Sequence, residues 1–451
     1  MSTSVRIPPG PAALPRGGWR NWGDTYSCSP VSQESPASED QLVSIVTGAA
    51  ASGERVKVVG AGHSFTDIAC TDGRLLHLDN YGRVLDLDTA TGLVRVEAGI
   101  TIEEINHQLA RHGRALRNMG DIAYQSIAGA ISTSTHGTGG RVGNLASQVE
   151  SLTMVLADGS VLDCRAENDP QTYSAALVGL GALGVISTVT LRTVPAFRLH
   201  NVQKRAPLAQ LLEELDDRVD GNDHFEIFFF PHSDVGLGIT NTVTDEPAKP
   251  RGDLSKWTNS VLLENHAFGL MQRIGRAQNS WIPSLNRFSA NLMGGTDTVD
   301  ASYKVFANVR LVRFQEMEYA VPRAAGAEVI REIRAMIDRL GLRISFPVEV
   351  RFGPADDITL STAHGRDTCY VAVHVFHRMD YDVYFHEVEA IMRAHAGRPH
   401  WGKLHFQTAE SLAAVYPRFG EFVAVRDRLD PNGLFANDYL DRVVGLAPGR
   451  G

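Results

Sequence analysis

The chain has 451 residues, and its 43 lysines and arginines against 52 aspartates and glutamates give a formal net charge of -9. This length predicts two domains, or one domain with a large insertion, and allows a sizeable ligand to be buried. No basic block that would track phosphates is present, and no run approaches the ~18 apolar residues of a membrane span, so neither nucleic acid nor a membrane span is expected.

The first 20 residues are rich in proline and lack the apolar core of a secretory signal. We interpret them as a flexible N-terminal arm and expect a cytoplasmic protein. The cysteines Cys28, Cys70, Cys164 and Cys369 are widely spaced and contain no Cys-x-x-Cys pair. They predict neither a disulfide framework nor a zinc ribbon, and we interpret them as ordinary buried thiols.

Short strands dominate the chain from residue 55 to 195. The β-rich segments bounded by turn residues are 55–59, 75–78, 93–98, 152–156 and 185–194. Asp158-Gly159 predicts a type I′ hairpin, because both residues tolerate positive φ. One helix is predicted over 101–112, where Thr101 and Glu104 would form a capping box. The segment lacks the strand-helix rhythm of a doubly wound sheet and is predicted to be α+β.

After Pro195 the pattern changes to longer amphipathic helices mixed with strands. Helical spacing occurs over 208–219, 324–340 and 381–396, and strand patterns occur over 225–230, 348–352 and 370–375. This change predicts a second unit. The region 236–295 has no clear periodicity.

Three glycine-rich stretches lie in the first unit. Gly60-Ala61-Gly62 follows a β-branched run and would expose consecutive backbone N–H groups to an anion, although a plain tight turn has the same sequence. Over 126–140 nearly every residue is small or hydroxylated, which a simple β-turn does not explain. Together with 179–184, these stretches predict a long, extended ligand across the first unit.

The chain carries four motifs in order: Gly60-Ala61-Gly62-His63-Ser64-Phe65, the Ser-Ile-Ala-Gly to Thr-His-Gly-Thr-Gly stretch, Gly181-Ala182-Leu183-Gly184-Val185-Ile186 and His400-Trp401-Gly402-Lys403. Together they resemble the vanillyl-alcohol-oxidase superfamily of FAD enzymes, and within it the oxidases and dehydrogenases of L-gulono- and D-arabinono-1,4-lactone. The likeness runs from about residue 21 to 444. It implies an FAD-binding domain at 21–194, a substrate-binding cap domain at 195–415 and a C-terminal segment at 416–451 that returns to the FAD domain, after the arm at 1–20.

The resemblance implies FAD, attached covalently through the histidine of the Gly-His-Ser motif, which is His63. The alternative is that His63 only caps its own turn. Gly120 matches a position where a small residue leaves oxygen a path to the flavin, which favours an oxidase, although glycine also suits a turn. The residues that would contact the cofactor are Val59, Gly60, Ala61, Gly62, His63, Ser64, Gly120, Asp121, Ser126, Gly129, Ser132, Thr135, His136, Gly137, Gly184, Ile186 and Lys403.

Charged side chains occur in two apolar strands of the second unit. Glu349 and Arg351 share one face of their strand by period-two alternation, and His374 lies in the other strand. A surface ion pair on an edge strand would have the same pattern. By resemblance, Glu349, Arg351, His374 and Lys403 would surround the substrate and flavin N5 as the catalytic residues.

The resemblance implies that a secondary hydroxyl of an aldono-1,4-lactone loses a hydride to flavin N5, with oxygen or another acceptor reoxidising the flavin. His374 is the expected base, because an imidazole titrates near neutrality. Polyol oxidases carry threonine where this chain has Phe376 and serine where it has Asp121, and both differences favour the lactone branch. The alternatives are an alditol or other carbohydrate or nucleoside alcohol oxidase, or, in another class, a non-catalytic flavin- or carbohydrate-binding protein.

The histidines do not predict a metal site. His374 and His377 would point to opposite faces of a strand, and no acidic residue completes a metal-binding motif with His400 and His405. The segment 317–319 (Met-Glu-Tyr) lies in a predicted strand and is interpreted as a structural edge.

Overall fold

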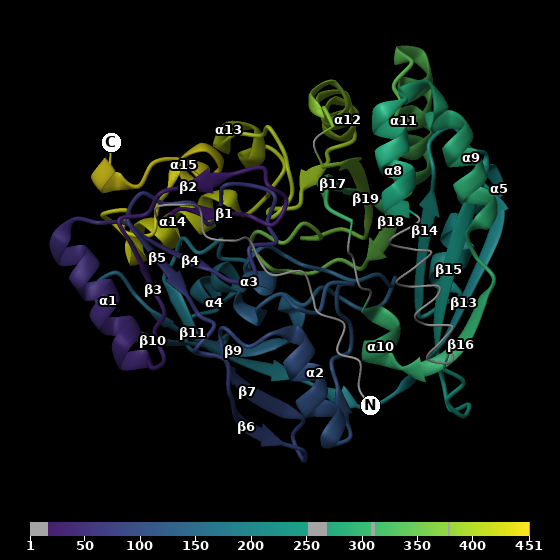
Figure 1. The fold of residues 1–451 in the computed structure, drawn as a ribbon. Coiled ribbons are helices and arrows are strands. Elements are labelled where there is room, and N and C mark those ends of the chain that lie inside the picture. The colour runs from purple at the N-terminus through teal and green to yellow at the C-terminus, as the bar shows by residue number, and fades with distance from the viewer. Residues whose placement is uncertain (1–16, 251–267, 308–311, 378, 451) are drawn as a thin grey trace.

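The computed structural model describes residues 17–250, 268–307, 312–377 and 379–450. The expected N-terminal arm lies outside the described residues except for 17–20. The chain forms two units side by side, and the C-terminal helices lie on the first unit (Figure 1). The predicted α+β class is confirmed. Within the described part of the chain, no helix combines the length and apolar character needed to cross a membrane.

The first unit is built on a five-stranded antiparallel sheet, β10-β9-β11-β7-β6, and a three-stranded parallel sheet, β3-β5-β4. The strands of the first unit are β1 Trp19–Arg20, β2 Ser27–Cys28, β3 Ser32–Glu34, β4 Val56–Val59, β5 Arg74–His77, β6 Val84–Asp88, β7 Leu93–Glu97, β8 Arg114–Ala115, β9 Val149–Val155, β10 Val161–Cys164, β11 Val185–Arg192 and β12 Val194–Pro195. The helices of the first unit are α1 Glu39–Ser52, α2 Ile102–Arg111, α3 Ile127–Ser132, the 3-10 turn η1 Ala146–Gln148 and α4 Pro170–Leu177.

The second unit, here called the cap, contains an eight-stranded antiparallel sheet with the order β16-β13-β15-β14-β18-β19-β17-β20. Its strands are β13 Arg198–Pro207, β14 His224–Phe229, β15 Val235–Thr244, β16 Thr296–Ala301, β17 Phe314–Pro322, β18 Val348–Gly353, β19 Thr368–Phe376 and β20 Arg398–Pro399. Its helices are α5 Leu208–Glu213, α6 Leu215–Asp220, α8 Phe268–Ala277, η3 Asn279–Trp281, α9 Ile282–Leu292, α10 Ser302–Phe306, η4 Arg323–Ala325, α11 Gly326–Leu340 and α12 Asp382–Ala394.

The cap sheet has one apolar face and one face with charged side chains. Val348, Val350 and Phe352 of β18 pack in an apolar core with residues of α5, α11 and α12. Because strand side chains alternate, Glu349 and Arg351 of the same strand point to the opposite face, toward the first unit. The helices therefore leave one face of the sheet to form a wall of the site.

After β20 the chain returns to the first unit. Trp401 already packs in the core of that unit, ahead of residue 416. The returning helices are α13 Ala409–Ala413, α14 Phe419–Leu429, α15 Asp438–Val443 and η5 Pro448–Arg450. A main-chain hydrogen bond of 2.8 Å from Val56 N to Leu434 O joins the return to β4, so β4 is held from both sides.

Several predicted elements differ in detail. The helix predicted over 208–219 is two short helices, α5 and α6, which meet at Glu214. Thr101 caps α2 as predicted, but Glu104 does not complete a capping box, because its carboxylate accepts from Gln108. The prediction of a type I′ turn at Asp158-Gly159 is wrong, because only Gly159 has positive φ there. Gly159 N donates to Leu156 O. A hairpin of β9 and β10 still forms.

Candidate active site and cofactor cleft

Two cavities meet between the first unit and the cap. Both are lined by His63, Ser64, Gln125 and Thr133, so they form one elongated cleft with His63 at its middle. One cavity lies within the first unit against the three glycine-rich stretches. The other lies between the first unit and the charged face of the cap sheet and is called the reaction cavity below.

Small residues shape the cavity of the first unit. The loop after β4 turns at Gly62, where φ is +67°, a conformation that favours glycine. A Cβ atom on Gly60 would lie 2.1 Å from the hydroxyl oxygen of Ser126, so only glycine allows this approach of the two stretches. Ser126 caps α3 through a hydrogen bond from Gly129 N. This narrow groove of accessible backbone fits an extended phosphate-bearing cofactor such as FAD.

Most of the predicted cofactor-binding residues line the cleft. Those in the cavity of the first unit are Val59, Gly60, Ala61, Gly62, His63, Ser64, Ser126, Gly129, Ser132, Gly184 and Ile186. Those in the reaction cavity are His63, Ser64, Gly120, Asp121, Thr135, His136 and Lys403. Gly137 lines neither cavity: its carbonyl accepts from His136, and a Cβ there would lie 2.4 Å from Met119 O. Gly137 therefore contributes through its close packing against Met119 behind the cavity lining, and not through the lining itself.

His63 is a buried imidazole between two aromatic rings. Its ring centroid lies 5.0 Å from that of Trp22 and 4.5 Å from that of Tyr124. Burial, and then the nearby ammonium of Lys403, lower the pKa of His63 to about 3. The ring is therefore neutral at physiological pH and keeps a nitrogen lone pair that can act as a nucleophile.

Arg351 stands among three carboxylates in the reaction cavity. Its guanidinium is paired with Glu349 on its own strand, with Glu226 of β14 at 3.1 Å and with Asp121 of the first unit at 3.4 Å. Burial alone would lower the pKa of Arg351, but these carboxylates raise it well above its ordinary value. The strand β18 lies between β14 and β19, so the alternative of an ion pair on an edge strand is wrong.

His374 and Lys403 meet at Glu316, a residue that sequence reasoning missed. Lys403 Nζ is paired with one carboxylate oxygen of Glu316, and His374 Nε2 lies 3.5 Å from the other. Glu316 lies directly opposite His374 in the pairing of β17 and β19. All four predicted catalytic residues, Glu349, Arg351, His374 and Lys403, therefore line one cavity.

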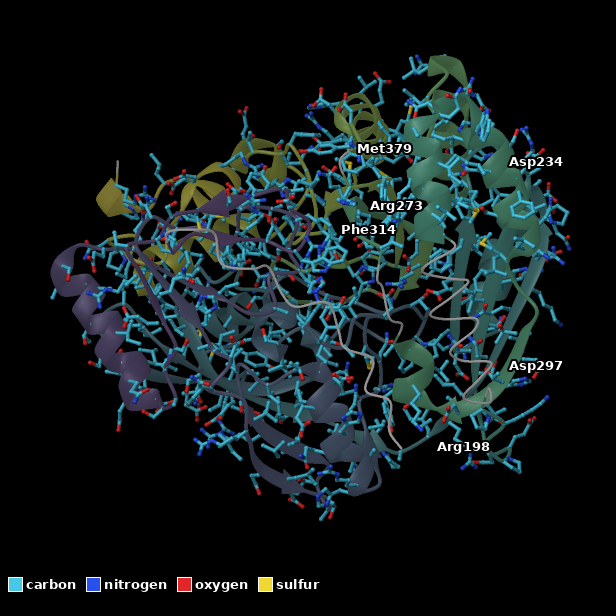
Figure 2. All side chains as sticks on the ribbon, viewed as in Figure 1. Arg198, Asp234, Arg273, Asp297, Phe314 and Met379 are labelled. Carbon is cyan, nitrogen blue, oxygen red and sulfur yellow. The ribbon has the colours of Figure 1, made fainter. Side chains whose placement is uncertain are left out.

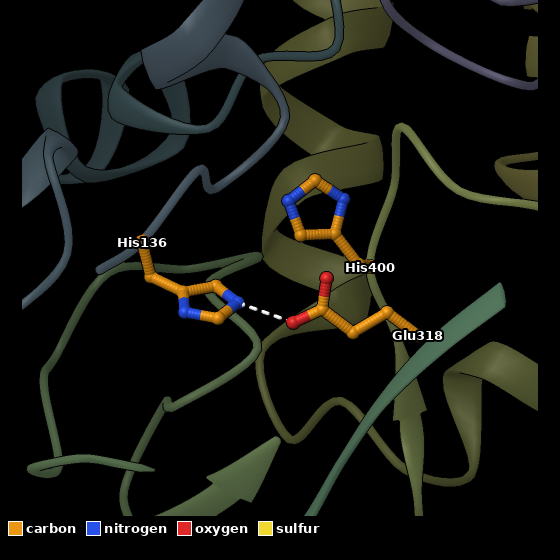
Figure 3. A group of neighbouring side chains, drawn as sticks. All are labelled: His136, Glu318 and His400. Carbon is orange, nitrogen blue, oxygen red and sulfur yellow. Dashed lines mark hydrogen bonds and ion pairs between the residues drawn. The ribbon is translucent and has the colours of Figure 1, made fainter. Parts of the chain in front are cut away.

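A buried cluster of His136, Glu318 and His400 lies at the back of the reaction cavity (Figure 3). Their potential ligand atoms lie within 4.8 Å of one another. His136 Nε2 lies 2.6 Å from Glu318, and the His136 ring stacks on Tyr370 with 3.5 Å between centroids. His400 Nδ1 accepts from Gly402 N at 3.0 Å, so the hydrogen of this neutral ring is on Nε2. This tautomer leaves His400 without a free lone pair, which disfavours a metal.

The interpretation of 317–319 as a structural edge is wrong, because β17 lies between β19 and β20 and sends Glu316 and Glu318 into the cavity. Period-two alternation in β17 places these two carboxylates on one face. That alternation could have identified the two carboxylates from the sequence.

Aromatic residues close the cap side of the cavity. Figure 2 shows Phe314 on the inner side of the cap, away from Asp234 and Asp297 at its outer edge.

The fold and the cleft fit the class of proteins that hold an extended, phosphate-bearing cofactor beside a second, polar cavity. A model of the FAD binding domain matches residues 34–165, and a model described as D-arabinono-1,4-lactone oxidase matches 189–443. The L-gulono-1,4-lactone dehydrogenase of Mycobacterium tuberculosis (strain ATCC 25618 / H37Rv) is 49% identical over 95% of this chain and 99% of its own. The L-gulonolactone oxidase of Bos taurus is 35% identical over 94% of this chain and 98% of its own.

The chain therefore belongs to the D-arabinono-1,4-lactone oxidase family and is an FAD-dependent oxidoreductase. The predicted resemblance is confirmed. A solved structure of a solvent-stable cholesterol oxidase has a TM-score of 0.81 at 19% identity and covers 97% of this chain and 100% of that chain. At this identity the likeness supports the fold alone.

Proposed function

We propose that this protein oxidises a secondary hydroxyl of an aldono-1,4-lactone. The observation that carries the proposal is the reaction cavity itself, where Arg351, His374 and Lys403 converge on a space that opens onto His63. A polyhydroxylated substrate needs several donors and acceptors in a partly apolar cavity, and these residues supply them. The relatives named for L-gulono- and D-arabinono-1,4-lactone support the lactone as the substrate class.

The residues have separable roles. FAD, when bound, would supply the acceptor for the hydride of the carbinol carbon. Arg351, oriented by Glu349, donates to substrate oxygens and fixes the sugar ring, since a guanidinium presents a rigid fork of donors. The Lys403 ammonium stabilises negative charge on the reacting oxygen. His374 Nε2 accepts the hydroxyl proton.

Substrate choice can be tested by comparing lactones with alditols. We expect kcat/KM for L-gulono-1,4-lactone or D-arabinono-1,4-lactone to exceed that for xylitol or sorbitol. The aromatic wall supports this preference, because Phe314 and Phe346 line the cavity near His374 and offer an apolar surface to a ring. Faster turnover of the alditols would favour the alternative of an alditol oxidase.

We further propose that FAD is attached covalently through a ring nitrogen of His63. The neutral state of His63 and its place where the two cavities meet support this attachment. After acid precipitation, flavin should stay with the wild-type protein and pass into the supernatant for His63→Ala. Release of flavin from the wild type would contradict the covalent link but not FAD binding.

The electron acceptor depends on access to the flavin, and we propose that oxygen serves through the space beside Gly120. A Cβ on Gly120 would lie 3.2 Å from His136 O and 3.3 Å from the Thr135 methyl, so alanine fits with only a small shift. Gly120→Ala should therefore slow reoxidation by oxygen but not anaerobic reduction by the lactone. If the wild type reoxidises slowly in air but quickly with a dye, the protein is a dehydrogenase.

A further inference from the structure

Glu316 lies between the two residues that would handle the substrate hydroxyl. Its carboxylate contacts Lys403 on one side and His374 on the other, and its side chain is only 7% exposed. Main-chain bonds fix this arrangement: Glu316 is paired with His374 across β17 and β19, and Leu404 N donates to Glu316 O at 2.9 Å. Glu316 is therefore positioned by the sheet itself.

The hydrogen bonds of His374 determine which nitrogen can accept a proton. His374 Nδ1 lies 3.0 Å from Pro347 O. A carbonyl oxygen only accepts, so Nδ1 carries a hydrogen. In the neutral ring the lone pair is then on Nε2, the atom that faces Glu316. A proton taken up at Nε2 arrives beside a carboxylate.

Glu316 remains ionised across the working pH range. Burial alone would raise the pKa of Glu316, but Lys403 and His374 lower it to about 2. The charged or titratable groups that face it are Lys403 and His400 after β20, His374 of β19, Glu318 of its own strand and His63 of the glycine-rich loop. Lys403 holds one carboxylate oxygen, which leaves the other directed at His374.

We propose that Glu316 is the positioning residue of the proton-accepting step, which makes His374 and Glu316 a functional pair. The proposal rests on the proposed function. As the substrate O–H bond breaks, its proton forms an N–H bond at His374 Nε2, and its electron pair stays on oxygen to form the carbonyl. The C–H electron pair leaves with its hydrogen as the hydride, for which FAD would be the two-electron acceptor. Glu316 balances the positive charge of the new imidazolium and keeps Lys403 near the oxygen.

The test compares the pH dependence of anaerobic flavin reduction in wild type and Glu316→Gln. A general base must be neutral to act, so protonation of the base at acid pH lowers the rate. A neighbouring carboxylate favours the protonated base. Its removal should therefore move the acid limb, the low-pH fall of the reduction rate, to lower pH by about 1 unit. The rate on the plateau should fall about tenfold, because the imidazolium loses its counter-charge. Glu316→Asp should restore the position of the limb.

Glu389→Gln is the matched control. Glu389 and Glu316 are each 5% exposed when the whole residue is counted. Glu389 accepts a hydrogen bond from Tyr319 of β17, but it does not line the reaction cavity. If Glu316 has a purely structural role, both glutamine variants should lose stability, and the acid limb should stay at the same pH in both. An acid limb that stays in place in Glu316→Gln would overturn the proposal.

A second readout is the 15N NMR titration of His374 in the holoenzyme, assigned by the signals lost in His374→Asn. The midpoint at Nε2 should be lower in Glu316→Gln than in wild type, and an unchanged midpoint would overturn the pairing. This readout does not depend on turnover. If no lactone reduces the wild-type flavin, the proposed function fails, whereas the titration still decides whether Glu316 controls protonation of His374.

Discussion

Nε2 of His136 lies 2.6 Å from a carboxylate oxygen of Glu318, although 182 residues separate the two in the chain. His136 belongs to the second glycine-rich stretch and Glu318 to β17 of the cap. Their side chains are 5% and 8% exposed, so solvent screens this contact little. The pair therefore joins the two units at the back of the reaction cavity.

Removing one member of this pair should destabilise the protein strongly. Loss of one partner from a buried pair leaves the other uncompensated, and Glu318→Gln should lower the free energy of unfolding by about 3 kcal/mol. Urea unfolding followed by fluorescence measures this. The control is Glu421→Gln, which breaks a more exposed pair with Arg418 and should cost less than about 1 kcal/mol. Equal losses would contradict the structural role of Glu318.

Arg351→Lys tests whether the guanidinium fork, rather than a positive charge, is required. Lysine keeps the charge but cannot contact Glu349, Glu226 and Asp121 at once. We expect kcat/KM for the lactone to fall about 100-fold. The FAD content should stay normal, because Arg351 lies in the reaction cavity and not in the cavity of the first unit. An unchanged kcat/KM would show that charge alone suffices.

Asp356 should make the protein less stable as the pH rises. Burial raises the pKa of Asp356 from 3.8 to about 6, even though Ser361 and Ile358 donate to its carboxylate. Between these values the unfolded chain ionises this group while the folded chain keeps it protonated, so stability falls as the pH rises through this window and levels off above about 6. The loss is at most about 3 kcal/mol. Urea titrations from pH 4 to 7 measure how the free energy of unfolding depends on pH, and Asp356→Asn should remove this contribution to the dependence. An identical dependence in both proteins would contradict its assignment to Asp356.

Cys28 should be the most reactive thiol among the four cysteines. The interpretation as buried thiols is wrong for Cys28 and Cys70, which are only partly buried. A hydrogen bond with Cys70 lowers the pKa of Cys28 to about 7, whereas burial raises the pKa of Cys164 to about 12. Because the thiolate is the nucleophile, iodoacetamide should label Cys28 first, with a rate that rises near neutral pH. Peptide mass mapping that finds Cys164 labelled as fast would contradict this.

The cofactor cleft was predictable because its signal is local. A loop in which Gly60 must pass close to Ser126 requires small residues at both places, and the sequence displays them directly. The strands β4, β9 and β11 were likewise predicted from β-branched runs between turn residues.

The carboxylates of β17 were missed because their roles depend on distant residues. The strand is buried on both faces along most of its length, so apolar patterning does not distinguish the cavity side from the core side. Glu316 meets Lys403 from 87 residues further along the chain, and Glu318 meets His136 from 182 residues earlier. Alternation shows that both carboxylates share a face but cannot show what they contact.

The most direct test of the central claim is to mix the purified protein with L-gulono-1,4-lactone without oxygen and follow the flavin absorbance in wild type and His374→Ala. The account predicts that the wild-type flavin bleaches and that His374→Ala bleaches at least about 100-fold more slowly, because a general base contributes that much. A wild-type flavin that stays oxidised with every lactone would contradict the proposed function. Equal rates in the two proteins would contradict the role of His374.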